Sequence, residues 1–101
     1  MDKITIIQGD TYEAQVSFTG IDDFSVFERI IFSCKDFGIC KEIEFENELN
    51  CYVLKFTPEE TKNMKSGSST FDITVIYKDR NVQTPIYCND ILVKRKVNYC
   101  G

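Results

Sequence analysis

The chain has 101 residues and a formal net charge of -4 at pH 7, and 43% of its residues are hydrophobic. This length predicts one domain, residues 1–101, that buries enough surface to fold without stabilising cross-links. The negative charge disfavours nonspecific nucleic-acid binding, which depends on clustered Lys and Arg. No run approaches the ~18 consecutive apolar residues of a membrane span, and the N-terminus has no signal-peptide layout. We therefore expect no nucleic-acid or membrane partner, and synthesis in the cytoplasm.

Seven segments show the alternation and composition of β-strands, with turn residues between them. They are residues 3–8, 12–19, 28–35, 39–46, 51–57, 70–78 and 82–97, the last interrupted near Asn89-Asp90. Their inward positions are expected to include Tyr12, Val16, Phe18, Ile30, Phe32, Leu54, Phe56, Phe71, Ile73 and Val75. Short strands at near-regular spacing predict an all-β sandwich rather than alternating β and α units.

One short helical turn is predicted over residues 58–64. Thr57 is a good N-cap, because its hydroxyl can accept the amide of Glu60. Pro58 suits the first helical position, where its missing N–H costs nothing. Glu60, three residues past the cap, can close a capping box with the cap's own amide. A single helical turn between two half-buried strands is how many sandwich domains change sheets.

The five cysteines are Cys34, Cys40, Cys51, Cys88 and Cys100. An odd count with no secretory signal argues against a disulfide framework. Three of them, Cys34, Cys51 and Cys88, fall inside strand-like runs, where a reduced cysteine serves as a small hydrophobe. We expect reduced thiols, with these three inaccessible in the native state. A metal site and a redox or cross-linking role are the alternatives, although the chain has no histidine to complete a zinc site.

The sequence predicts no enzyme and no cofactor. Without histidine, Ser-His-Asp and Cys-His arrangements are excluded, and no phosphate-binding or dinucleotide motif is present. The row Glu42, Glu44 and Glu46 has the spacing of one strand face and is interpreted as solvated rather than as an acid/base site. A calcium site at Asp22-Asp23 or at Asn89-Asp90 is a further alternative, but neither loop has the dense oxygen ligands of a dedicated site.

Several short motifs are spread from the first strand to the last: Ile7-Gln8-Gly9-Asp10-Thr11, residues 52–61, Gly67, Phe71-Asp72-Ile73, Thr84 and Ile91-Leu92-Val93. In this order they resemble the immunoglobulin-like N-terminal domain of phage baseplate upper proteins, a family of phages and prophages of Gram-positive bacteria. The resemblance implies an immunoglobulin-like sandwich of about seven strands. It also implies a non-enzymatic virion component that packs against other tail or baseplate proteins. The chain departs from the family in ending at Gly101, and in having Ser68-Ser69-Thr70 where the family has aromatic residues.

Two functions are therefore expected. The first is a tail or baseplate interaction module whose partners are other phage structural proteins, with self-association as an option. The alternative is a free phage-encoded inhibitor that binds a host defence protein through its acidic face. The terminal ribbon 82–97 is the preferred contact, because the basic cluster Lys94, Arg95 and Lys96 can steer an acidic partner. The other interpretation of this cluster is a solvated strand edge, where charge discourages aggregation. A third function, glycan binding, needs a cluster of exposed aromatic residues that the alternation does not provide.

Overall fold

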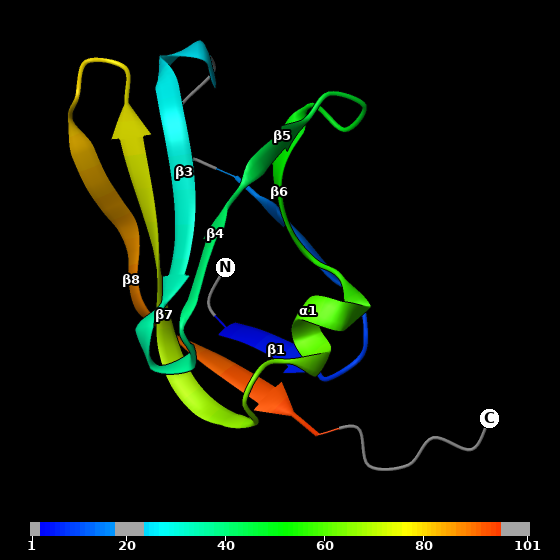
Figure 1. Ribbon diagram of the computed structural model, residues 1–101. Helices are drawn as coiled ribbons and strands as arrows, with labels where there is room; N and C mark the ends of the chain where they lie inside the picture. The colour runs from blue at the N-terminus through cyan, green and yellow to red at the C-terminus, as the bar shows by residue number, and fades with distance from the viewer. Residues whose placement is uncertain (1–2, 18–23, 96–101) are drawn as a thin grey trace.

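The computed structural model describes residues 3–17 and 24–95, the side chain of Phe24 excepted. This part of the chain forms eight strands, one α-helical turn and two 3-10 turns (Figure 1). The strands are β1 (Lys3–Ile7), β2 (Tyr12–Val16), β3 (Phe27–Cys34), β4 (Ile39–Glu42), β5 (Glu44–Glu46), β6 (Cys51–Phe56), β7 (Gly67–Tyr77) and β8 (Val82–Lys94). The helical turn is α1 (Pro58–Lys62), and the 3-10 turns are η1 (Phe24–Val26) and η2 (Lys35–Phe37).

The strands form an immunoglobulin-like sandwich of two sheets. One sheet has the order β1-β8-β7-β3-β4 and the other β2-β6-β5. In immunoglobulin lettering these are G-F-C-C′ and B-E-D, with β1 added in parallel beside the G strand. The prediction of an all-β, immunoglobulin-like sandwich is confirmed.

The core lies between the two sheets and is centred on Phe32 of β3, which is 0% exposed. Its ring centroid lies 5.6 Å from that of Phe56 and 5.2 Å from that of Phe71, so one aromatic cluster joins the sheets. The chain has no tryptophan, and Phe32 provides the bulk that a buried C-strand tryptophan gives antibody domains. All the predicted inward residues are buried except Tyr12, which is half-buried, and Phe18, which lies outside the described residues.

The predicted strand 39–46 is wrong in one respect, because it is two strands in different sheets. The amide of Ile43 donates to the carbonyl of Ile30 at 2.7 Å, which keeps the backbone beside β3 up to that residue. Glu44 then pairs with Val53 of β6. Figure 1 shows β4 running into β5 as the chain passes from one sheet to the other. Strands that bend from sheet to sheet make the corners of some sandwiches, and this corner raises the strand number from seven to eight.

The predicted helical turn is confirmed, although α1 ends at Lys62 rather than at residue 64. Thr57 accepts the amide of Glu60 at 3.2 Å and Glu60 accepts that of Thr57 at 2.9 Å, which is the reciprocal capping box. The turn connects β6 of the three-stranded sheet to β7 of the five-stranded sheet. It is therefore a sheet-changing element, as the sequence predicts.

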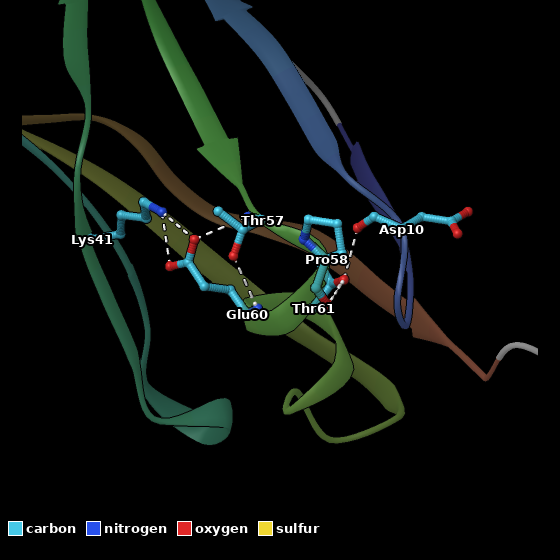
Figure 2. Close-up of polar contacts among 6 residues, drawn as sticks. All are labelled: Asp10, Lys41, Thr57, Pro58, Glu60 and Thr61. Carbon is cyan, nitrogen blue, oxygen red and sulfur yellow. Dashed lines mark hydrogen bonds and ion pairs between the residues drawn. The ribbon is translucent and has the colours of Figure 1, made fainter.

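A buried hydroxyl fixes α1 to the turn between β1 and β2. Thr61 is 0% exposed, and its Oγ1 accepts the amide of Gly9 at 3.0 Å. The same hydroxyl donates to the carbonyl of Asp10 at 2.7 Å, as Figure 2 shows. Gly9 has a φ of 86°, a conformation that favours glycine. The Gly9-Asp10 turn and the capped helix are thus parts of one structural joint.

The ribbon of β7 and β8 is irregular at two places. Its register shifts between Phe71 and Ile73, opposite a bulge at Cys88, whose φ is 54°. The amide of Cys88 donates to Oδ1 of Asp72 at 2.8 Å. Asp72 therefore anchors the amide of the bulged residue from the middle of β7. The interruption expected near residues 89–90 is this bulge.

The prediction for the cysteines is right for Cys34 and wrong for Cys88. Cys34 is buried, Cys51 is half-buried, and Cys40 and Cys88 are exposed; all four are free thiols. Cys88 is exposed because it lies in the bulge opposite Asp72, between the half-buried residues Ile86 and Asn89. Cys100 lies outside the described residues.

Candidate strand-binding groove

The outer edge of β4 is open in the described part of the chain, because β4 pairs with β3 alone. In an antiparallel pair, alternate residues direct both backbone polar groups at the partner strand. The bond from the Ile43 amide to the Ile30 carbonyl shows that the backbone polar groups of residue 43 point at β3. Those of Lys41, two residues earlier, point the same way. The backbone N–H and C=O groups of Cys40 and Glu42 therefore point away from β3.

A hollow lies beside this open edge, between β4 and α1. Its volume is about 610 Å³, and its apolar lining comes from Phe37, Ile39, Phe56 and Met64. The β5–β6 pairing ends at Val53, so residues 54–56 of β6 have no strand partner on this side among the described strands. A smaller hollow of about 220 Å³ continues along the same strands and shares Lys41, Glu42 and Glu44 with the first. We call the two hollows together the β4 groove.

An ion pair spans the larger hollow. Nζ of Lys41 lies 2.7 Å and 2.8 Å from the two carboxylate oxygens of Glu60 (Figure 2). The same Nζ lies 5.0 Å from the ring centroid of Phe56. The pKa of Glu60 is lowered below its usual 4.5. The hydrogen bond from Lys41 is the largest cause, and the hydrogen bond from the Thr57 amide is the second. Lys41 therefore connects the edge strand of one sheet to the helical turn that follows β6.

The predicted acidic row borders the groove. Glu42, Glu44 and Glu46 are all exposed, as expected for a solvated face. Glu42 lies 3.6 Å from Arg29, whereas Glu44 and Glu46 have no ion-pair partner among the described residues. Glu60 neutralises Lys41, and Lys55 of the smaller hollow lies 4.0 Å from Glu13, so the rim of the groove retains the negative charge of Glu44.

Next to its basic cluster, the described part of the terminal ribbon is paired on both sides. Asp90–Val93 of β8 pair with β1 on one side and with β7 on the other. Lys94 and Arg95 are exposed, and Lys96 lies outside the described residues. Within β8, only the first half has a side with no partner among the described strands. This half carries Pro85 and two register shifts, and proline and bulges both hinder strand addition.

Sequence reasoning missed the β4 groove because the switch at Ile43 carries no signal. The alternation of residues 39–46 is unbroken, and no Gly or Pro marks the corner. The calcium alternative at residues 22–23 lies outside the described residues, and Asp90 lies within β8 opposite Lys3. Across residues 3–17 and 24–95, no three carboxylates or thiols gather in a metal-binding group.

Fold and groove together define an immunoglobulin-like β-sandwich in which the edge strand β4 borders a groove. No family model matches the sequence, and no curated protein or solved structure is significantly similar to it. None of the helices in the described residues is long and apolar enough to cross a membrane.

Proposed function

We propose that the protein is a non-enzymatic interaction module of a phage or prophage tail or baseplate, and that it binds its partner at the edge of β4. The observation that carries the proposal is the open β4 backbone beside a hollow of about 610 Å³. An extended segment that adds to such an edge gains main-chain hydrogen bonds, and a neighbouring pocket for its side chains adds specificity.

The β4 edge suits this role better than the free half of β8. In β8, Pro85 lacks an N–H, and the bulge at Cys88 breaks the hydrogen-bonding repeat. In β4, the four residues Ile39–Glu42 pair in continuous register with β3 and include no proline. A regular strand presents its outward groups at a constant spacing, which a partner strand needs.

The phage setting is supported by the sequence resemblance. Three of its motifs are scaffold elements here: the Gly9-Asp10 turn, the capping box of Thr57 and Glu60, and the Asp72 anchor. They specify a domain of this shape rather than a catalytic site, which agrees with a structural role. The protein would then be made in the bacterial host cytoplasm and incorporated into the virion.

Mass spectrometry of purified phage particles tests the proposal. We expect the chain in intact particles at a constant ratio to the other tail proteins. Its absence from particles, together with its recovery on a host protein, would refute the virion role and support the inhibitor alternative.

The basic cluster stays a competing prediction for the contact. Lys94→Glu reverses its charge at an exposed position. If the contact lies at β4, this variant is incorporated as efficiently as the unmodified chain. Reduced incorporation at unchanged thermal stability would return the interface to the terminal ribbon.

A further inference from the structure

We infer that the β4 groove binds an extended segment of a partner protein in which basic and apolar residues alternate. The inference deepens the proposed function and rests on it. The partner backbone pairs with Cys40 and Glu42, its apolar side chains enter the hollow, and its Lys or Arg side chains lie beside the acidic row.

The alternation follows from the two faces of β4. Ile39, Lys41 and Ile43 share the inner face, which borders the apolar lining of the hollow. Cys40 and Glu42 are exposed on the outer face. Side chains of an added strand lie next to those of β4 on the same face. A partner residue on the inner side therefore lies beside the apolar lining and the Lys41–Glu60 ion pair, and one on the outer side lies near Glu42.

The charge of the partner follows from the ion pairs that the chain already makes. A lysine that points inward from an edge strand ordinarily deters an apolar strand. Here both carboxylate oxygens of Glu60 bind the Lys41 ammonium, so its charge is balanced within the chain. Glu44 lines both hollows and has no ion-pair partner in the described ranges. Opposite charges on adjacent strands stabilise their pairing, so the segment is basic.

A peptide titration tests the inference. The probe is a fluorescently labelled peptide of sequence Lys-Val-Lys-Val-Lys-Val-Lys, and its counterpart carries Glu in place of each Lys. We expect the basic peptide to bind at least about tenfold more tightly than the acidic one in fluorescence anisotropy, and the difference to shrink in high salt. Equal affinity of the two peptides, or no binding by either, overturns the inference.

Two pairs of variants locate the contact. Glu44→Lys should weaken binding of the basic peptide by about tenfold. Glu48→Lys makes the same charge change outside the groove lining and should leave the affinity within about twofold. Cys40→Pro removes an N–H that points into the groove and should abolish binding, whereas Cys40→Val keeps that N–H and should not. Equal effects of the two lysine variants, or of the two Cys40 variants, contradict the assignment.

Failure of this inference can be distinguished from failure of the proposed function. If the chain is incorporated into particles but no alternating basic peptide binds it, the inference is wrong and the interaction module stands. Thermal melting of each variant shows whether the domain is folded. Glu44→Lys keeps the test valid if Cys40→Pro fails to fold, because Glu44 is exposed and its side chain makes no ion pair among the described residues.

Discussion

Lys41 and Glu60 form an ion pair with Nζ–O distances of 2.7 Å and 2.8 Å, across the space between the edge strand and the helical turn. Glu60 also accepts the Thr57 amide at 2.9 Å. One carboxylate therefore both caps the helix and binds the lysine of the edge strand across the larger hollow of the β4 groove.

Because of the ion pair, we expect the free energy of unfolding to depend on pH, and we expect Glu60→Gln to remove this dependence. The pKa of Glu60 is lowered in the folded protein, so its contribution to stability is present above the unfolded-state pKa. That contribution is lost as the pH falls below 4.5 and through the lower folded-state pKa. Glutamine still accepts the capping bond, so at pH 7 the variant should lose less than about 1 kcal/mol.

Urea denaturation from pH 7 to pH 3 measures this effect. The difference in the free energy of unfolding between the unmodified chain and Glu60→Gln should decrease to zero as the solution is acidified. Glu59→Gln, in the same exposed turn, is the matched control and should show no such convergence. A difference that stays constant with pH would show that the ion pair does not stabilise the fold.

Thr61→Val should destabilise the domain by about 1–3 kcal/mol, because it removes the hydroxyl that pairs with the backbone of Gly9 and Asp10. Thr61→Ser keeps the hydroxyl and should lose only about 1 kcal/mol through its missing methyl group. Chemical denaturation of the two variants compares these values. The joint would have no energetic role if Thr61→Val unfolded at the same urea concentration as the unmodified chain.

Phe32→Ala should cost about 3–5 kcal/mol, because Phe32 is fully buried between the rings of Phe56 and Phe71. Tyr87 is 70% exposed, and Tyr87→Ala should change the free energy of unfolding by no more than about 0.5 kcal/mol. Thermal or urea unfolding compares the two variants. Equal losses would contradict a core centred on Phe32.

The bulge at Cys88 leads to a prediction that does not follow from the sequence alone. At a φ of 54°, a β-branched side chain is strained and glycine is not. Cys88→Val should therefore destabilise the domain by about 1–2 kcal/mol, whereas Cys88→Gly should be neutral or stabilising. Unfolding curves for the two variants decide between this geometry and a regular strand, in which valine would be the better residue.

The sequence was sufficient for features that depend on local chemistry. Alternation located the strands and the buried residues around Phe32, and the Thr57–Glu60 pair located the helical turn with its capping box. These features require only residue spacing and side-chain hydrogen bonding.

The candidate site depends on long-range pairing, which spacing does not encode. The alternation of residues 39–46 is the same whether they form one strand or cross between sheets at Ile43. Equally, nothing in residues 82–97 indicates that β1 covers only the second half of β8. The first effect hid the β4 groove, and the second hid the pairing of β8 on both sides next to the basic cluster.

Amide hydrogen exchange of the assembled protein tests the β4 interface most directly. The chain is compared alone and in the particle or complex in which mass spectrometry finds it. The account predicts that assembly slows exchange at Cys40 and Glu42, whose N–H groups point into the groove, and leaves residues 82–88 of β8 unchanged. Protection of residues 82–88 with no change in β4 would contradict it.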